Sequence, residues 1–270
     1  MTRFRHALFI LIVLLPLFAV AQKEEWDTYL AEYEKGVGST LLNMSVKTIA
    51  PVKKMPFVLI TGVKFSDCPT DGMPSNSEFA NLYLIFDSIQ AKINRSVENM
   101  LVGTFTYQCE RLDYYYVKDT NGLRQALLKL YAARFSQYQP YVNIKEDKNW
   151  DAYLSFLYPN EETFEFMQNQ KVLLGLEKAG DKLDKARKTD HWIYFGTETD
   201  RNCFIEYVTK NSFKIEAKEN VTGSNFSYKL QISRNDKIDL AAISRLTLEL
   251  RRQAKKCNGA YDGWETFVIK

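Results

Sequence analysis

The sequence has few of the residues that metal and redox sites need. It contains two histidines and four cysteines, and no two cysteines stand in a CxxC spacing. A zinc site takes three or four closely spaced nitrogen or sulfur ligands, and the sequence offers no such cluster. It also lacks the Gly-x-Ser-x-Gly motif that carries the nucleophile of many hydrolases. We therefore expect no metal and no cofactor, and the sequence favours a protein that is not an enzyme.

Neither sign of charge is in excess. The chain has 36 lysines and arginines against 33 aspartates and glutamates, which gives a net charge of +3. Proteins dedicated to nucleic acids normally show a strong basic bias, so we expect no nucleic-acid partner. Hydrophobic residues at 46% and aromatic residues at 14% suffice for buried cores, which argues against a disordered chain.

Only one long hydrophobic run occurs, at residues 7–20, and Pro16 interrupts it. It is shorter than the ~20 apolar residues of a membrane-spanning helix. Arg3 and Arg5 precede the run and Ala19-Val20-Ala21 ends it, which is the pattern of a secretory signal peptide. We expect cleavage after Ala21 and a secreted or periplasmic protein that does not span the membrane.

The rest of the chain predicts an α+β protein with two ferredoxin-like domains, each of the order β-α-β-β-α-β and each with both helices on one face of its sheet. A hairpin at residues 26–46 precedes them. The first domain is expected to have strands at 57–65, 101–108, 111–117, 141–145 and 150–156, with helices after Ser75 and at 120–135. The second is expected to have strands at 192–196, 212–219, 226–233 and 264–269, with helices at 200–210 and 236–256.

Two helices deserve separate predictions. Ser75 and Glu78 form a capping box, and the helix that follows is expected to turn six apolar side chains to the core: Phe79, Leu82, Tyr83, Phe86, Ile89 and Ile93. A polar helix from Asn160 to about Lys188, with a charged tail from Glu177, predicts a solvated linker. The expected parts are therefore a signal peptide at 1–21, a domain at 22–158, a linker helix at 159–188 and a domain at 189–270.

The four cysteines permit disulfides in an oxidising compartment, with buried free thiols as the alternative. Cys203 lies in the first turn of one helix of the second domain, and Cys257 closes the other helix. These ends meet at one edge of the predicted sheet, so we predict a Cys203–Cys257 disulfide. Cys68 and Cys109 follow parallel strands separated by a third, a gap of about 9.6 Å. That gap exceeds disulfide reach unless the loops bend inward, so this pair stays open.

Three carboxylates surround the loop before the first long helix: Asp67, Asp71 and Glu78. They suit a cation site or acid–base chemistry, or they serve the turn and the helix cap. His191 is a candidate base, but no nucleophile motif accompanies it, which favours a structural role.

A possible interaction surface combines cations and aromatic residues. Arg251, Arg252 and Lys255 lie near a helix C-terminus, where the dipole favours cations and where an anionic partner would also bind. Tyr114 and Tyr116 alternate with Tyr115 along a strand, so one face of that strand is expected to be outward. Trp264 follows a turn and either enters the core or contacts a partner.

Two regions resemble known families. The segment Tyr261-Asp262-Gly263-Trp264-Glu265-Thr266-Phe267 is similar to the closing segment of the RraB family, regulators of ribonuclease E activity, and this resemblance covers residues 189–270. A second set of residues lies between 23 and 159: Trp26, Tyr29, Asp71-Gly72-Met73-Pro74, Val102-Gly103, Thr106, Arg111, Tyr114-Tyr115-Tyr116, Trp150-Asp151-Ala152-Tyr153, Leu157 and Pro159. With these residues the first domain resembles domain-of-unknown-function family 695, which implies no activity. The RraB resemblance implies a non-enzymatic role in binding a protein.

We therefore expect an exported regulatory or protein-binding module whose partner is an unidentified protein of the cell envelope. Two alternatives remain at this point. One is a cation-dependent hydrolase that uses the loop of Asp67, Asp71 and Glu78. The other is a regulator of a ribonuclease E-type enzyme, if the chain is not exported.

Overall fold

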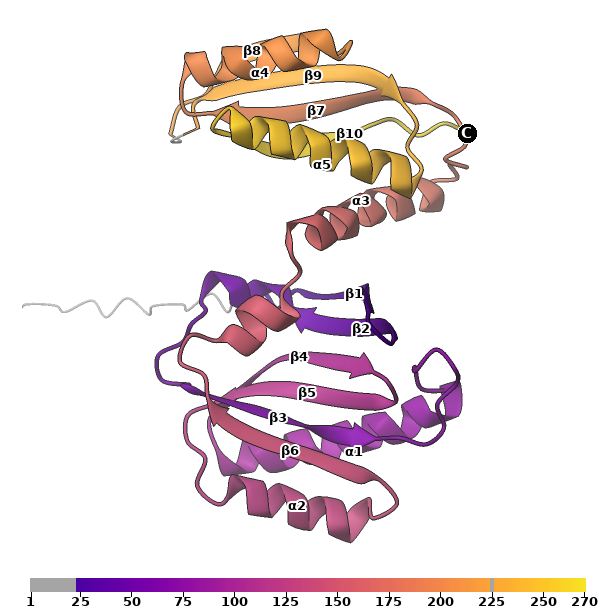
Figure 1. Ribbon diagram of the computed structural model, residues 1–270, viewed down its shortest axis with the longest axis vertical. Coiled ribbons are helices and arrows are strands. Elements are labelled where there is room, and N and C mark those ends of the chain that lie inside the picture. Colours follow the sequence, from indigo (N-terminus) through magenta and orange to yellow (C-terminus); the bar gives the residue numbers. More distant parts are fainter. Residues whose placement is uncertain (1–22, 224–225) are drawn as a thin grey trace, which may run out of the picture.

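The computed structural model describes residues 23–223 and 226–270, which form two α+β units (Figure 1). The predicted signal peptide lies outside the described residues. The first unit has the strands β1 (Trp26–Tyr33), β2 (Gly36–Asn43), β3 (Phe57–Lys64), β4 (Asn99–Tyr107), β5 (Glu110–Val117) and β6 (Gln139–Glu146). Its helical elements are η1 (Met44–Thr48), α1 (Asn76–Ser96), α2 (Leu123–Arg134) and η2 (Ala152–Leu157).

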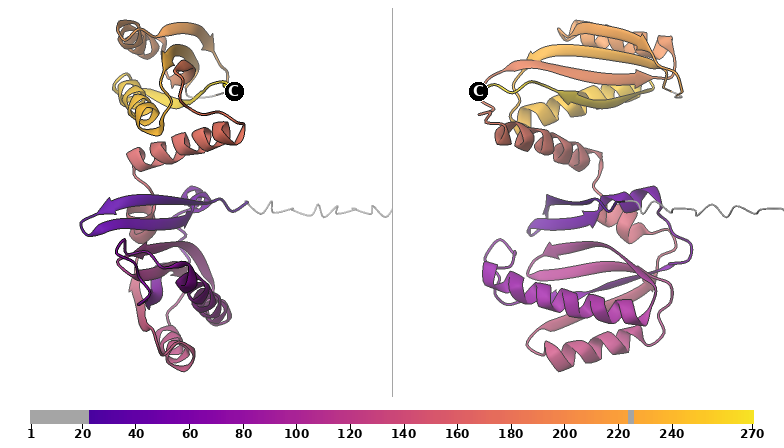
Figure 2. Two further views of the ribbon diagram at one scale, coloured as in Figure 1. Left: turned by 90° about the vertical axis from the view of Figure 1, so that its right-hand side faces the viewer. Right: turned by 180° about the vertical axis from the view of Figure 1, so that it is seen from behind.

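The second unit is smaller. Its strands are β7 (Arg187–Phe195), β8 (Lys214–Asn220), β9 (Tyr228–Asp236) and β10 (Gly259–Glu265). Its helices are α3 (Glu161–Lys178), α4 (Glu198–Lys210) and α5 (Leu240–Lys256). Helix α3 lies between the two sheets (Figure 2).

Every strand pair in both sheets is antiparallel. The first sheet has the order β1-β2-β4-β5-β3-β6 and the second has the order β10-β7-β9-β8. Without the β1–β2 hairpin the first order becomes β4-β5-β3-β6. Counted along each unit, both orders then place the first strand between the third and the fourth, so the two units share one arrangement of strands.

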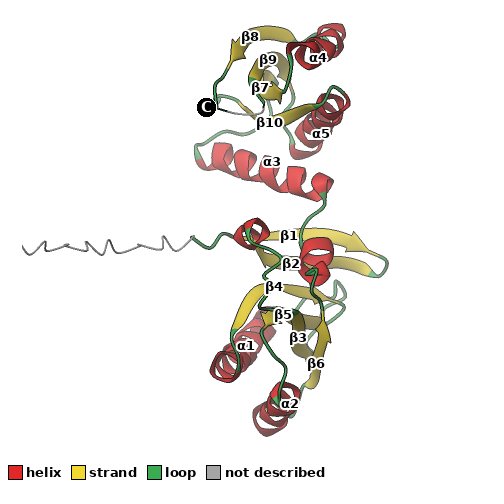
Figure 3. Cartoon of the chain, turned by 90° about the vertical axis from the view of Figure 1, so that its left-hand side faces the viewer, coloured by secondary structure: helices red, strands yellow, loops and turns green. Residues whose placement is uncertain are grey.

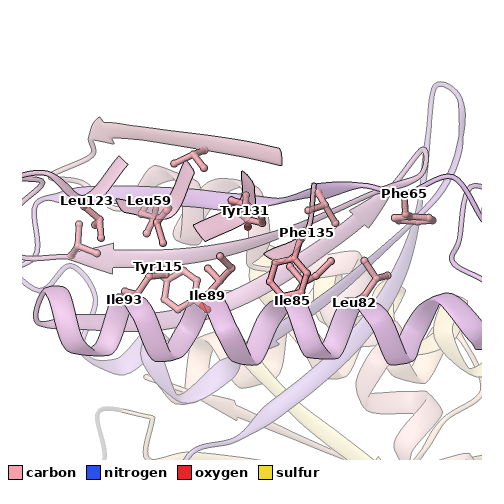
Figure 4. Close-up of a cluster of buried hydrophobic side chains, with 14 residues drawn as sticks. Leu59, Phe65, Leu82, Ile85, Ile89, Ile93, Tyr115, Leu123, Tyr131 and Phe135 are labelled. Carbon is pink, nitrogen blue, oxygen red and sulfur yellow. The ribbon is translucent and has the colours of Figure 1, made fainter. Parts of the chain in front are cut away.

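Both faces of the first sheet are covered. On one face, residues of α1 and α2 pack on Leu59 and Tyr115 (Figure 4). On the other face, Val58 and Tyr116 pack against Trp150 and Tyr153, which precede and form η2. Strand β5 is consequently buried without interruption from Asp113 to Val117.

The prediction of a strand at residues 150–156 was wrong. Both carboxylate oxygens of Asp147 accept backbone hydrogen bonds, from Asp151 and from Ala152, each at 2.9 Å. Such capping starts a helical turn, and Trp150 takes a φ of 60° at the bend. The apolar residues that were expected to close the sheet edge therefore form η2 on its second face.

Helix α1 begins as predicted, because the Ser75 hydroxyl accepts a hydrogen bond from the Glu78 amide at 3.2 Å. The predicted core face was only partly right. The buried side chains on α1 include Leu82, Ile85, Ile89 and Ile93, whereas Phe79 and Tyr83 are 36% and 54% exposed. The stripe of leucine and isoleucine residues takes the position over the sheet, so the two aromatic rings stand beside it.

Helix α3 differs from the predicted linker. It ends at Lys178, and its Leu173 and Leu176 pack with Ile243 and Trp264 of the second unit. The charged segment after it is not fully solvated either. Asp181 and Arg187 form an ion pair in which both side chains are 1% exposed.

Both cysteine pairs form disulfides, with Cα–Cα distances of 5.6 Å for Cys68–Cys109 and 5.8 Å for Cys203–Cys257. The second pair joins α4 to the C-terminus of α5, as predicted. The first pair, left open by the sequence, closes because the loop bends inward: the Cys109 amide donates to the Gly72 carbonyl at 3.0 Å. Among the described residues, no helix has both the length and the apolar character needed to cross a membrane.

Candidate functional site

A cleft in the second unit is formed by α3, α5 and β10. It begins with an irregularity in β10: the pairing with β7 shifts between Tyr261 and Gly263, so Asp262 is an extra residue. Such a bulge bends the strand and redirects its side chains. Trp264 turns inward here and is 9% exposed.

Asn169 holds the floor of the cleft together. The indole nitrogen of Trp264 donates to Asn169 Oδ1 at 2.7 Å. The amide nitrogen of Asn169 in turn donates to Ser244 at 3.2 Å and to Thr247 at 2.9 Å. Because Asn169 is 1% exposed, these bonds satisfy an amide that would otherwise be costly to bury.

An ion pair closes one side of the cleft. Arg251 donates to Glu165 Oε2 through Nε at 2.8 Å and through Nη2 at 2.6 Å. The guanidinium carbon of Arg251 also lies 5.3 Å from the centre of the Tyr261 ring. Burial, with the nearby Glu165 carboxylate second, raises the pKa of Tyr261 well above its ordinary value. Arg251 is therefore held in one position between a carboxylate and an aromatic face.

The cleft has a volume of about 370 Å³. It is lined by the bonded residues Glu165, Asn169, Arg251 and Trp264, together with Phe164, Gln168 and Asp262. A second hollow of about 250 Å³ follows it along the same helices, between Glu161 and Glu162 of α3 and Arg252 of α5. Lys255, with its side chain 79% exposed, approaches Glu161 to 4.0 Å. Glu161 and Glu162 in the first turn of α3 therefore partly offset the positive charge of Arg252 and Lys255. Both cationic side chains remain at the surface.

Of the six residues predicted for an interaction surface, the structure brings four to this region: Arg251, Arg252, Lys255 and Trp264. Tyr114 and Tyr116 are buried, at 5% and 0% exposure, so they do not form an exposed patch. The reason is the cover on the second sheet face. Tyr116 stacks on Trp150 with ring centres 3.8 Å apart, and its hydroxyl donates to Asp147 at 2.6 Å.

The carboxylates proposed for a hydrolase are used in the loop itself. Asp67 accepts hydrogen bonds from Ser75 and Ser77, which lower its pKa, and Asp71 accepts from the Met73 amide at 3.0 Å. Glu78 accepts from the Tyr138 hydroxyl at 2.6 Å. Within residues 23–223 and 226–270, no group of three or more potential metal-ligating side chains occurs. Asp67 and Asp71 thus serve the loop and the helix start, whereas Glu78 joins α1 to the segment before β6.

His191 is fully buried in the second unit. Its two ring nitrogens lie 2.9 Å from the Tyr261 hydroxyl and 3.2 Å from the Thr189 hydroxyl. Burial lowers its pKa to about 4, so the ring is neutral near pH 7. Its contacts join two strands, which fits the structural role.

Sequence reasoning missed Glu165 and Asn169, although a signal existed. Both stand four residues apart on α3, followed at helical spacing by Leu173 and Leu176. A buried helical stripe that mixes polar and apolar side chains looks like a solvated face when only hydrophobic residues are counted. Its meaning depends on the α5 side chains that it meets.

Comparisons with known proteins divide the chain in the same way as the sheets do. Residues 24–158 match the model of a family of unknown function, DUF695. Residues 166–266 match the model of the family described as regulator of ribonuclease activity B, and this range includes most of α3. No curated protein matches the chain. A solved structure described as an unknown protein from Galdieria sulphuraria matches with 9% identity and a TM-score of 0.22, over 78% of this chain and 97% of that one.

Proposed function

This chain belongs to the family of unknown function DUF695. We propose that it is an exported, non-enzymatic regulatory protein that binds a protein partner through the cleft of α3, α5 and β10. The likeness to regulators of ribonuclease activity favours regulation by binding. The single observation that carries the proposal is the cleft itself. Its polar groups bond to one another, while the exposed Arg252 lines the adjoining second hollow and Lys255 lies exposed further along α5, the two forming a basic rim.

The charge of the rim favours an acidic partner segment. The Glu165 carboxylate is occupied by Arg251, and the Asn169 amide by three side chains. Groups that are already paired hold a surface in shape but add little new binding energy. The exposed cations Arg252 and Lys255 are only partly offset by Glu161 and Glu162, so they can attract carboxylates of a partner, which is how charged rims steer association.

Export is supported by the sequence pattern at residues 1–21 and by the two disulfides, since disulfides persist mainly in oxidising compartments. We further propose that the domain boundary falls at residues 158–159 and that each unit is ferredoxin-like. The shared strand order and the helices on one sheet face support this arrangement.

The experiment is a crosslinking pull-down from the cell envelope with the full exported chain as bait. A variant with Arg252→Glu and Lys255→Glu is expected to lose the partner that the native chain captures. The matched control, Lys210→Glu with Lys218→Glu, changes the net charge by the same amount at exposed positions elsewhere in the second unit. This control is expected to retain the partner. Equal capture by both variants would contradict the proposed surface.

Export has its own test. Sequencing of the N-terminus of the purified protein is expected to begin at Gln22. An intact Met1 would contradict export and would favour the alternative of a regulator that acts on a ribonuclease inside the cell.

A further inference from the structure

The first unit carries a separate hollow on the face of its sheet that bears α1 and α2. The hairpin β1–β2 widens the sheet beyond the reach of α1 (Figure 3). A hollow of about 260 Å³ lies where the helix stops covering the strands. Pockets for drug-sized ligands measure about 300–1,000 Å³, so this one suits a smaller molecule.

The floor of the hollow is unusually polar for a sheet face beneath a helix. Thr104 and Thr106 of β4 pair across the ladder with Asp113 and Arg111 of β5. Ser39 of β2 pairs with Thr106 on the other side. Since directly paired residues share a face of the sheet, hydroxyls from neighbouring strands stand beside one guanidinium.

Arg111 is a cation that forms no ion pair with any described residue, although its charge acts on the buried carboxyl of Asp113, two residues along the same face of β5. It is partly buried, and its Nε is buried with no hydrogen bond in the structure. Within the described ranges, no carboxylate lies close enough to form an ion pair with it. Its guanidinium carbon lies 5.0 Å from the centre of the Tyr83 ring, which holds the planar group over an aromatic face. A partly desolvated guanidinium in this position favours an anion with two oxygens, because its donors match a carboxylate in a two-bond contact.

Thr104 adds an acceptor beside that cation. Its hydroxyl donates to Asp113 Oδ1 at 2.7 Å, so the hydrogen points away from the hollow that Thr104 lines. The remaining lone pairs of the hydroxyl accept from a donor in the hollow. Asp113 itself is 5% exposed and acts through Thr104.

Apolar side chains complete the walls. Leu41 of β2 and Phe79 of α1 are both 36% exposed, and Met73 closes the end of the hollow. Met73 belongs to the loop that the Cys68–Cys109 disulfide ties to the β4–β5 turn, and the bond from the Cys109 amide to the Gly72 carbonyl at 3.0 Å fixes it further. The wall is therefore in place before a ligand arrives, which lowers the cost of binding.

We propose that this hollow binds a small organic carboxylate that carries a hydrogen-bond donor on the adjacent carbon and an apolar tail, the class of amino and hydroxy acids. The carboxylate contacts Arg111, the donor contacts Thr104, and the tail lies against Leu41 and Phe79. This site is independent of the cleft in the second unit, and its test does not depend on a protein partner.

The test is a titration followed by NMR of the full mature chain with four probes that share one branched tail. These are leucine, 2-hydroxy-4-methylpentanoate, 4-methylpentanoate and 3-methylbutylamine. The binding of the first two is expected to saturate below about 10 mM and to shift signals of β2, β4 and α1. 4-Methylpentanoate is expected to bind at least several-fold more weakly, and the amine not at all.

Variants separate recognition from folding. Arg111→Gln is expected to weaken the binding of leucine at least tenfold, and Arg111→Lys is expected to weaken it less. The control Arg95→Gln, at an exposed position, is expected to leave it unchanged. Thr104→Val is expected to remove the advantage of leucine over 4-methylpentanoate, a difference that a merely structural role of Thr104 would leave unchanged. The proposal is overturned if neither donor-bearing acid shifts these signals, or if Arg111→Lys and Arg111→Gln both bind as the native chain does.

Discussion

The two units share one arrangement of strands but bury their sheets differently. In β5 of the first unit, five successive residues from Asp113 to Val117 are buried. In β7 of the second unit, buried residues alternate with more exposed ones along the whole strand. The first sheet is covered on two faces and the second is packed against helices on one. Strand order alone therefore does not decide which side chains reach the surface.

The cover on the second face of the first sheet comes from segments outside the repeated elements. The η1 segment precedes them and η2 follows them, and both contribute side chains to that buried face, whereas the β1–β2 hairpin widens the sheet at one edge. The second unit has α3 as its added element, and α3 packs against α5 instead of against the open sheet face. The same core arrangement thus carries its extra element in a different place in each unit, and each place creates its own hollow.

The largest expected effect is on the cover of the first sheet. Trp150 is fully buried, stacks on Tyr116 and donates to the Met55 carbonyl at 3.0 Å. Trp150→Ala should destabilise the first unit by about 3–5 kcal/mol, because it leaves a cavity and an unpaired carbonyl. Chemical denaturation with peptide-resolved hydrogen exchange would locate the loss.

Leu84→Ala is the matched control, because Leu84 is 62% exposed on α1 and should change stability little. If Trp150→Ala loosened both units equally, they would be one cooperative structure and the comparison between them would fail.

The disulfides come next in size. They close similar lengths of chain, with separations of 41 residues for Cys68–Cys109 and 54 for Cys203–Cys257. Replacing either pair by alanines should cost about 2–4 kcal/mol, because the unfolded chain regains freedom. Each loss should appear in the hydrogen exchange of its own unit, measured on the two double variants in parallel. Equal exchange in both units for either variant would mean that the crosslinks act beyond their own domains.

Acid should affect the two units in opposite directions through one group in each. Burial lowers the pKa of His191 to about 4, below its ordinary value of about 6.5. Between these values only the unfolded chain binds the proton. This contribution to the second unit is therefore complete above about pH 6.5 and falls by up to about 3 kcal/mol as the pH drops through 4.

In the first unit, burial raises the pKa of Asp113 to about 6, against the opposing effects of Arg111 and Thr104. Here the folded chain keeps a proton that the unfolded chain loses. The contribution is complete below about pH 4 and is lost as the pH rises through 6. Melting curves from pH 7 to 4 would test both groups. The His191→Gln variant should lose less stability in its second unit as the pH falls, and the Asp113→Asn variant should gain less stability in its first unit. Unchanged slopes in either variant would show that other groups govern that response.

The smallest effect should come from an ion pair at the contact between the units, where Met167 of α3 also packs in one cluster with Tyr29 of β1. Lys171 of α3 lies 2.6 Å from Asp27 of β1, with side chains 44% and 17% exposed. Lys171→Ala should cost no more than about 1 kcal/mol, because solvated ion pairs contribute little. Double-mutant cycles with Asp27→Ala would measure the coupling. A coupling of several kcal/mol would contradict the picture of two units that are stable separately.

Periodicity and caps predicted most of the elements, because these signals lie within a few residues of one another. Ser75 and Asn160 each accept a hydrogen bond at the start of a helix, as predicted, which short polar side chains do through local geometry. Thr197 and Asp239 cap the helices that the sequence prediction began at 200 and 236. The prediction failed at residues 150–156, where an apolar run fits a strand and a helical turn equally. The predicted burial of Phe79 and Tyr83 was also wrong, because the pattern of an amphipathic helix does not show how far the sheet extends beneath it.

The sequence by itself determined the two α+β units, the helix starts at Ser75 and Asn160 and the pairing of Cys203 with Cys257. The helix starts follow from local capping preferences, and the pairing follows from the strand order that the element sequence predicts. The tertiary structure alone decided that Tyr114 and Tyr116 are buried, that Asn169 joins Trp264 to α5, and that Arg111 lines a hollow without forming an ion pair in the part of the chain that the structure describes. Each of these outcomes depends on which distant segment covers a face. A side chain responds to the surface that it meets, and no local pattern encodes that surface.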